Sequence, residues 1–291
     1  MKLERPSHAK VNLLLNILGQ RPDGFHELET VMHPVNLCDR LDLESTRAPG
    51  IALTCSNPSL ACDASNLVYR AAACFFQETR IMDGVRIHLE KRIPLAAGLG
   101  GGSGNAANTL LGLNELFDRP LGPDRLTAIA AALGSDVPFF LQSNPALATG
   151  RGERIVPLPF FPALRDHFVV LIHPGFGVPT AWAYQNLARF PAALKGEPGR
   201  AHRLIPLLQS GDAASAGRAL YNSLEAPVLQ KYPLLQMFQE FLREQGALAA
   251  LMSGSGSTTF ALAATEAAAN VLAERFQAQF GPGCWIAVVA L

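Results

Sequence analysis

A glycine-rich stretch in the first half of the chain has the composition of an anion-binding loop. Residues 98–104 contain five glycines, and an apolar pattern with helical spacing follows from Asn105. Glycine lets backbone N–H groups turn toward one centre and lets a ligand approach the main chain. The N-terminus of a helix adds unpaired N–H groups and the positive end of the helix dipole. The stretch therefore predicts a phosphate site, and with it a nucleotide-using enzyme.

This loop does not match the two commonest nucleotide-binding patterns. No Lys-Ser or Lys-Thr pair follows its glycines, as the Walker A pattern G-x-x-x-x-G-K-[ST] requires, and the dinucleotide spacing G-x-G-x-x-G does not occur in it. A purely structural flexible loop is the alternative, although so many glycines carry an entropic cost that needs a reason. If the loop binds phosphate without the Walker A lysine, charge neutralisation of that phosphate must come from Mg²⁺ and from side chains elsewhere in the chain.

A second loop, SGSGST at residues 253–258, has the same donor-rich composition in the other half of the chain. The alternative for this loop is a tight turn beside a helix contact, because Ser and Gly dominate turns. Two such loops in separate halves fit a ligand cleft between two domains.

Two charged residues stand in apolar surroundings and are candidates for handling the group that attacks the phosphate. Asp136 follows a helical pattern and precedes the sequence VPFF, so it is either a helix cap or a functional carboxylate. Lys10 lies in an apolar strand pattern, where the alternative is a solvent-facing strand edge. A pair between the two would explain both positions, because the ammonium would keep the carboxylate ionised and help polarise an acceptor hydroxyl.

The overall composition indicates a globular chain with room for two domains. The chain has 291 residues, 49% hydrophobic residues and a formal net charge of zero, so a bulk attraction to nucleic acid is not expected. The apolar run at residues 11–18 is interrupted by two asparagines and is shorter than the roughly 20 residues that span a bilayer. No small-residue cleavage site follows it, and we expect a cytoplasmic protein.

The cysteines and histidines show no metal-binding or disulfide pattern. The five cysteines are odd in number and include no C-x-x-C pair, and the seven histidines are scattered. We expect the cysteines to be small buried side chains in a reducing compartment. They are Cys38, Cys55, Cys62, Cys74 and Cys284.

Apolar periodicity predicts alternating strands and helices, and hence an α+β fold. A proline-rich stretch near residue 160 suggests the boundary between domains 1–160 and 161–291. The expected strands cover residues 7–18, 85–91, 168–172, 247–252, 260–263 and 285–290, and residues 28–43 are expected to be a further strand or a loop. The expected helices cover residues 66–76, 105–117, 123–133, 180–187, 200–220, 233–244 and 265–279.

Three ordered blocks make the chain resemble the GHMP kinase superfamily, which uses a P-x-x-x-G-L-G-[GS]-[GS]-[GS] phosphate loop in place of Walker A. The first is PSHAKVNL at residues 6–13, followed by RPDGFHEL at 21–28. The second runs from KRIP at 91–94 to NAA at 105–107, and the third is LGSDVPFF at 133–140. The SGSGST loop matches the superfamily's third motif, so the resemblance covers nearly the whole chain.

Within the superfamily, the chain looks like the branch that phosphorylates a cytidyl substrate. That resemblance implies ATP-dependent, Mg²⁺-assisted phosphorylation of the 2-hydroxyl of a diphosphocytidyl methylerythritol, in the non-mevalonate route to isoprenoid precursors. It implies a small-molecule substrate and neither nucleic acid nor membrane as a partner, and it leaves open a monomer or a weak dimer.

The same resemblance assigns roles by position. Asp136 resembles the catalytic base and Lys10 its partner, while Ser103 looks like a phosphate or metal-side contact. Asn12, Phe25, His26 and Tyr184 fall where the substrate is held, the aromatic groups against cytosine. The implied ATP site contains Asn66, Lys91, Pro94, Leu95, Ala96, Ala97, Gly98, Leu99, Gly100, Gly101, Gly102, Ser103 and Gly104.

The resemblance also implies a fold and exposes three departures. It implies an N-terminal domain of the ribosomal S5 domain 2-like type and a ferredoxin-like C-terminal domain. Phe25 replaces a frequent tyrosine, Gly104 a frequent serine and His8 a frequent proline, which affect affinity more than the reaction. A GHMP kinase for a sugar, homoserine or mevalonate-type acceptor is the alternative enzyme. A non-catalytic nucleotide-binding protein is disfavoured because Lys10 and Asp136 are both present.

Overall fold

The computed structural model describes residues 1–291, which form two compact units that each combine several segments of the chain. The first unit contains Met1–Ala9, Leu37–Pro94 and Gly100–Ser143, and the second contains Lys10–Asn36, Leu95–Leu99 and Asn144–Leu291. Two long strands, β1 (Lys2–Gln20) and β2 (His26–Thr46), contribute residues to both units. The boundary near residue 160 stays a prediction.

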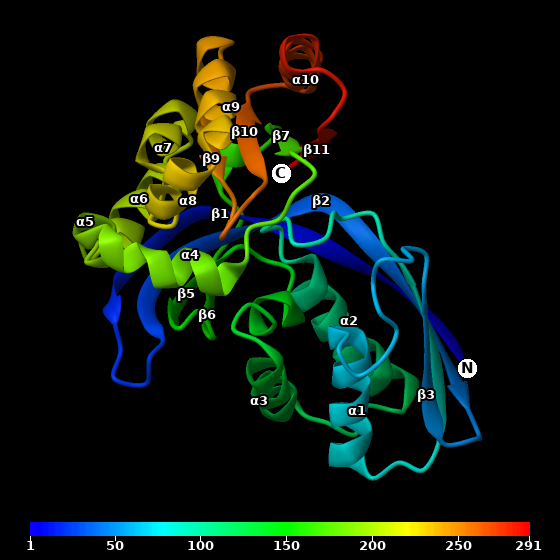
Figure 1. The fold of residues 1–291 in the computed structure, drawn as a ribbon. Helices are drawn as coiled ribbons and strands as arrows, with labels where there is room; N and C mark the ends of the chain where they lie inside the picture. The colour runs from blue at the N-terminus through cyan, green and yellow to red at the C-terminus, as the bar shows by residue number, and fades with distance from the viewer. The chain divides into compact units, whose positions relative to one another are not determined.

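The first unit places helices beside a sheet (Figure 1). The sheet order within it is β3-β4-β2-β1, with β3 (Gly50–Cys55) parallel and β2 antiparallel to β4 (Gly84–Glu90). The helices are α1 (Leu67–Thr79), α2 (Gly101–Leu116) and α3 (Pro123–Leu133), and η1 (Pro138–Leu141) is a 3-10 helix. Buried Phe75 of α1 stacks near Phe117, with ring centroids 6.0 Å apart, as the apolar spacing of α1 predicts.

The second unit is built on an antiparallel sheet in the order β11-β7-β10-β9. Its strands are β7 (Phe168–His173), β9 (Ala249–Met252), β10 (Thr259–Ala263) and β11 (Trp285–Ala290). Helices α9 (Pro233–Glu244) and α10 (Glu266–Phe280) pack on this sheet. Phe238 and Phe276 meet edge to face in the core, with centroids 4.7 Å apart. The four-stranded sheet with its helices confirms the expected α+β class.

The other strands of the second unit extend β1 and β2. Strand β8 (Tyr221–Asn222) pairs parallel to β1, while β5 (Ala146–Gly150) pairs with β2 and with β6 (Arg154–Pro157). The remaining helical segments are η2 (Pro162–Leu164), α4 (Thr180–Asn186), η3 (Leu187–Arg189), α5 (Pro191–Leu194), α6 (Arg200–Gln209), α7 (Ala213–Ala219) and α8 (Glu225–Lys231). Strands β3, β5, β6 and β8, helices α5 and α8 and the 3-10 helices η1 and η2 were not among the predicted elements.

The structure corrects one predicted helix. The single helix expected over residues 200–220 is two helices, because Gly211 adopts a φ of +85° between them and Asp212 caps the second by accepting a bond from Ser215 N. The spacing of apolar residues along this segment does not by itself distinguish one helix from two.

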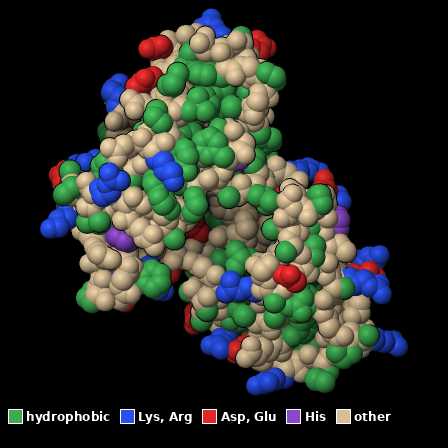
Figure 2. All heavy atoms as spheres, in the orientation of Figure 1, with side chains coloured by type: hydrophobic (Ala, Val, Ile, Leu, Met, Phe, Trp, Pro, Cys, Tyr) green, Lys and Arg blue, Asp and Glu red, His purple; other side chains and the backbone are tan.

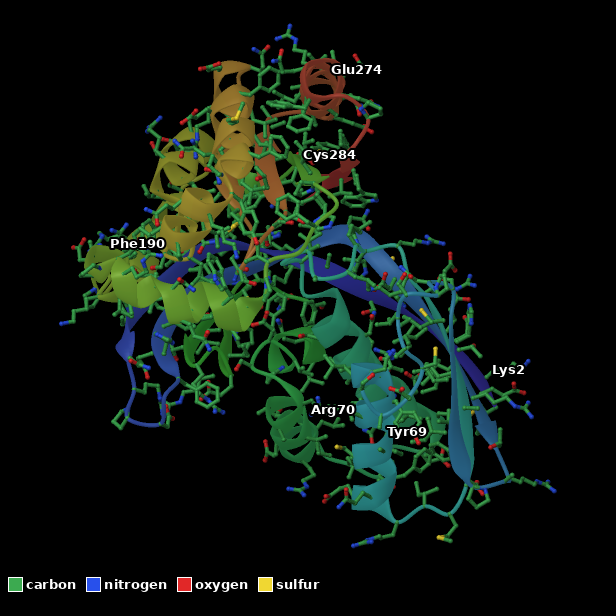
Figure 3. The ribbon with its side chains drawn as sticks, viewed as in Figure 1. Lys2, Tyr69, Arg70, Phe190, Glu274 and Cys284 are labelled. Atoms are coloured by element: carbon green, nitrogen blue, oxygen red, sulfur yellow. The ribbon has the colours of Figure 1, made fainter.

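The predicted burial of the cysteines is also wrong. All five are free, but Cys62 is exposed and the other four are half-buried, among them Cys284 just before β11 (Figure 3). On the face drawn in Figure 2, Lys and Arg side chains are scattered among Asp and Glu, in keeping with the zero net charge. None of the helices combines the length and the apolarity that a bilayer crossing needs.

Candidate active site

The two glycine-rich loops lie against each other in the second unit. Residues Leu95–Leu99 of the first loop meet the turn between β9 and β10, where Thr258 N donates to the Ala97 carbonyl at 3.2 Å. Ser253 Oγ donates to the Gly98 carbonyl at 3.0 Å. Gly98 has a φ of +77°, and a Cβ added there would collide with the Ser253 carbonyl. Only glycine therefore fits at position 98, and the loops form one structural element.

The later residues of the first loop begin helix α2 in the first unit. Gly100 caps the helix with a φ of 71° and no side-chain hydrogen bond, and residues Gly101 to Gly104 are already helical. The predicted start at Asn105 is therefore four residues late. The first turn carries Ser103, half-buried, and no acidic residue. The free N–H groups of this turn and its dipole make it suited to an anion.

The glycine at position 104 has a packing reason. A Cβ there would lie 3.0 Å from Ser7 Oγ, 3.1 Å from the His8 carbonyl oxygen and 3.4 Å from Phe140 Cδ1. The first turn of α2 is thus in close contact with β1 and η1. The departure from the frequent serine at this position fits the tight packing around it.

Lys10 is buried in β1, with 2% of its surface exposed, so the alternative of a solvent-facing lysine is wrong. Its Nζ donates to Asn12 Oδ1 at 2.6 Å and to the Gly98 carbonyl at 2.8 Å. Asn12 Nδ2 in turn donates to Thr30 Oγ1 at 2.9 Å. The structure therefore brings three predicted site residues, Lys10, Asn12 and Gly98, into one hydrogen-bonded group.

Asp136 lies in the first unit, in the turn between α3 and η1. It is half-buried, and the four residues after it are all buried, as the apolar sequence VPFF predicts. The cap residue of η1 is Val137, so Asp136 stands one position before the cap. Since Lys10 belongs to the other unit, the pair between Lys10 and Asp136 stays a prediction.

Two residues predicted to contact the nucleotide, Asn66 and Lys91, are held by protein groups. Asn66 caps α1 by accepting a bond from Val68 N at 2.9 Å, and its Nδ2 donates to the Ala61 carbonyl at 2.7 Å. Lys91 forms an ion pair with Asp39 and lies 3.3 Å from Asn105 Oδ1. Their contact with a nucleotide stays a prediction.

The sequence reasoning missed Asp39, although this residue binds several groups on both sides of the glycine-rich loop. It is completely buried and accepts hydrogen bonds from Arg92 N at 2.7 Å, Ile93 N at 2.9 Å and Asn105 Nδ2 at 2.9 Å. A signal was available, because Asp39 is a charge inside an apolar strand pattern, as Lys10 is.

Of the predicted substrate residues, His26 and Tyr184 are neighbours. Their ring centroids are 5.1 Å apart with planes tilted by 41°, one ring at the start of β2 and the other on α4. Burial lowers the pKa of His26 below its ordinary value. Phe25 is 51% exposed, and the Arg151 guanidinium lies 4.4 Å above its ring. The unit thus presents aromatic surfaces suited to stacking on a flat base.

Models of two families match the chain. The model of the GHMP kinases N terminal domain matches residues 66–144, and that of the GHMP kinases C terminal domain matches residues 204–282. The first match contains the phosphate loop and Asp136, and the second contains Ser253 to Thr258.

Curated relatives match along almost their whole length. A 4-diphosphocytidyl-2-C-methyl-D-erythritol kinase of Geobacter sp. (strain M21) is 41% identical over 277 residues, which cover 95% of each chain. The protein of the same name from Pelotomaculum thermopropionicum is 42% identical and covers 93% of this chain and 92% of its own.

Solved structures resemble this chain over almost its whole length. A crystal structure of a 4-(cytidine 5'-diphospho)-2C-methyl-D-erythritol kinase superposes with a TM-score of 0.82 at 37% identity, covering 99% of this chain and all of the other. A homoserine kinase from Cytophaga hutchinsonii superposes with a TM-score of 0.78 at 21% identity, covering 100% of this chain and 95% of its own, a likeness of fold alone.

Proposed function

We propose that this chain, which belongs to the family of 4-diphosphocytidyl-2-C-methyl-D-erythritol kinases within the GHMP kinases, phosphorylates that substrate at its 2-hydroxyl with ATP. The observation that carries the proposal is the bond from Lys10 Nζ to the Gly98 carbonyl. It fixes a buried cation at the loop assigned to the phosphates, where positive charge would stabilise the transferring phosphoryl group.

The phosphates of ATP are assigned to the first turn of α2. Its N–H groups have no side-chain cap, Gly100 adds no side chain beside them, and no acidic residue in the turn would repel an anion. Ser103 adds a hydroxyl in the same turn. Asn66, Lys91 and residues Pro94 to Leu99 before the helix belong to the ATP site in this proposal.

Mg²⁺ fits this arrangement as an ion shared with the phosphates. The chain has no group of three or more His, Cys, Asp or Glu side chains that could hold a metal ion by themselves. Mg²⁺ in phosphoryl-transfer sites takes only one or two protein ligands besides phosphates and water. Ser103 would hold it with the phosphates, and the ion supplies charge neutralisation across them when bound.

Asp136 is assigned the role of general base. It accepts the proton of the substrate 2-hydroxyl while the hydroxyl oxygen forms its bond to the γ-phosphorus and the bond to ADP breaks. Lys10 is assigned as its partner, as the pair expected from the sequence. The hydrogen bonds of Lys10 to Asn12 and to Gly98 fix the ammonium beside the loop.

Specificity for the cytidyl group is assigned to the aromatic residues. His26 and Tyr184, already in ring contact, would hold cytosine, and Phe25 offers a second ring without the phenolic hydroxyl frequent there. Asn12 completes the set near Lys10. The lowered pKa of His26 favours a neutral ring, which has one donor and one acceptor for a base edge.

A coupled assay of ADP release with a panel of acceptors tests the function. With ATP and Mg²⁺, turnover is expected with 4-diphosphocytidyl-2-C-methyl-D-erythritol and not with homoserine, mevalonate or galactose. Absence of turnover with the cytidyl substrate at saturation would refute the proposal, and turnover with another acceptor would reassign the chain among GHMP kinases.

The assigned base is tested by Asp136→Asn. Because a general base contributes roughly 10²-fold or more, kcat is expected to fall at least ~10²-fold. Asp118→Asn is the matched control, since Asp118 is an exposed aspartate of the same unit just after α2. Near-wild-type turnover in the Asp136 variant would remove this residue from its role.

The cytidyl pocket has a binding test that needs no turnover. CMP or CDP is expected to raise the thermal midpoint of the wild-type protein, Tyr184→Phe to retain the effect and Tyr184→Ala to lose it, because the ring supplies the stacking surface. An equal shift in Tyr184→Ala would place the base elsewhere.

A further inference from the structure

We propose that Asn222 is a positioning residue of the kinase reaction. Its amide fixes the SGSGST loop, and that loop binds the Gly98 carbonyl that accepts a hydrogen bond from Lys10. The proposal rests on the function assigned above. Asn222 ends the short strand β8 and has 2% of its surface exposed. It lies outside every motif that the sequence analysis singled out.

The side-chain amide of Asn222 is satisfied on both sides. Its Nδ2 donates to the Met252 carbonyl and to the Gly254 carbonyl, both at 2.8 Å, while its Oδ1 accepts from Leu224 N at 2.9 Å. These partners define which end of the amide is the donor. Asn222 therefore clamps the two carbonyls on either side of Ser253, the first residue of the SGSGST loop.

Ser253 carries the constraint to the phosphate loop. It is completely buried, and its Oγ donates to the same Gly98 carbonyl that accepts from Lys10 Nζ. Gly254 is close to the ammonium as well, because a Cβ built on it would lie 3.1 Å from Lys10 Nζ. A shift of residues 252–254 would therefore move a hydrogen-bond acceptor of the lysine.

Strand β8 is itself anchored to β1, the strand that carries Lys10. Asn222 lies opposite Leu15, and Ser223 N donates to the Leu15 carbonyl at 2.8 Å. Ser223 Oγ accepts from Ile17 N at 3.0 Å. The path from Lys10 through Gly98, Ser253 and Asn222 back to β1 is thus closed within the second unit. A closed set of buried hydrogen bonds holds its members more rigidly than separate pairs.

The test uses Asn222→Asp, which keeps the shape and the acceptor for Leu224 N but turns an acceptor oxygen toward two carbonyls. The matched control is Asn114→Asp in the first unit. Asn114 is buried, donates to the Leu121 carbonyl at 3.0 Å and accepts from Leu121 N at 2.9 Å, but it lies at the far end of α2 from the phosphate loop.

Two measurements separate positioning from general stability. Labelling of Lys10 by an amine-reactive reagent, measured by mass spectrometry, is expected to be at least ~10-fold faster in Asn222→Asp, because the ammonium is then held less firmly. The value of kcat is expected to be at least ~10-fold lower, since small displacements of a reacting group cost this much or more. Asn114→Asp is expected to lower the thermal midpoint without changing either quantity.

The outcomes are distinct. Wild-type labelling of Lys10 and wild-type kcat in a folded Asn222→Asp overturn the inference. If that variant lacks a cooperative unfolding transition, Ser253→Ala replaces it in the test, since it deletes only the hydroxyl bound to Gly98. The inference then requires faster labelling of Lys10 in Ser253→Ala than in the wild type. Labelling needs no turnover, so failure of the proposed kinase reaction with every acceptor would not be mistaken for failure of this inference.

Discussion

Lys91 and Asp39 form an ion pair inside the first unit, with side chains that are 3% and 0% exposed. Asp39 belongs to β2, and Lys91 directly follows β4, its antiparallel neighbour. The pair lies at the N-terminus of α2, because a Cβ at Gly101 would be 3.2 Å from Lys91 Nζ. One carboxylate therefore ties a cation, two backbone N–H groups and Asn105 to the start of helix α2.

Asp39→Asn is expected to lower the free energy of unfolding by about 3–5 kcal/mol, the usual effect of leaving a buried charge without its partner. Denaturant unfolding measures it. Glu78→Gln, which breaks the exposed pair of Glu78 with Arg125, is the control and should change stability far less. Equal effects of the two substitutions would contradict the structural role of Asp39.

Gly98→Ala is expected to weaken ATP binding and to lower stability. The φ of +77° costs an alanine about 1–2 kcal/mol, and its Cβ would push against the Ser253 carbonyl. Gly283→Ala is the control, since no atom lies within 4 Å of a Cβ there. The KM for ATP and the thermal midpoint are the measurements, and unchanged values in Gly98→Ala would show that the two loops are not locked together.

The stability of the protein is expected to fall as the pH drops from about 6.5 to about 4. His33 is completely buried, and desolvation lowers its pKa to about 4 from the ordinary 6.5. The folded state then binds fewer protons than the unfolded state in this window, so acid favours unfolding, by roughly 3 kcal/mol for this group.

His33→Asn tests the assignment to this residue. An amide retains a donor for the Pro34 carbonyl, which lies 2.7 Å from His33 Nδ1, but it does not titrate. Urea unfolding at several pH values should show a smaller loss of stability between pH 6.5 and 4 in the variant. Parallel profiles of variant and wild type would assign the acid sensitivity to other groups.

Glu225→Gln is expected to stabilise the protein at neutral pH. Burial raises the pKa of Glu225, whose Oε1 accepts from Met252 N at 2.8 Å and Gln239 Nε2 at 2.6 Å. Wild type loses stability as the pH rises through that raised pKa, because the buried group must ionise. Glutamine keeps the acceptor without the charge, so its advantage should grow with pH. An advantage independent of pH would exclude ionisation as the cause.

Local patterns in the sequence determined several elements and the chemistry of the loops. The apolar spacing of residues 66–76 placed α1, and the alternation at residues 85–91 placed β4, because each pattern reports a single buried face of one element. The glycines of residues 98–104 and the isolated charges of Lys10 and Asp136 identified the kinase motifs without knowledge of any distant contact.

Tertiary structure alone decided which groups those motifs meet. Asp39 pairs with a lysine 52 residues away. Asn222 donates to Met252 at the end of β9, 30 residues away, and to Gly254 in the loop that follows, 32 residues away. The start of α2 at Gly101 and the division of residues 200–220 into two helices also depend on local backbone conformations that glycine permits but does not dictate. Sequence periodicity reports which face of an element is buried. The partner on that face is set by how distant segments pack, and this long-range packing is absent from any local pattern.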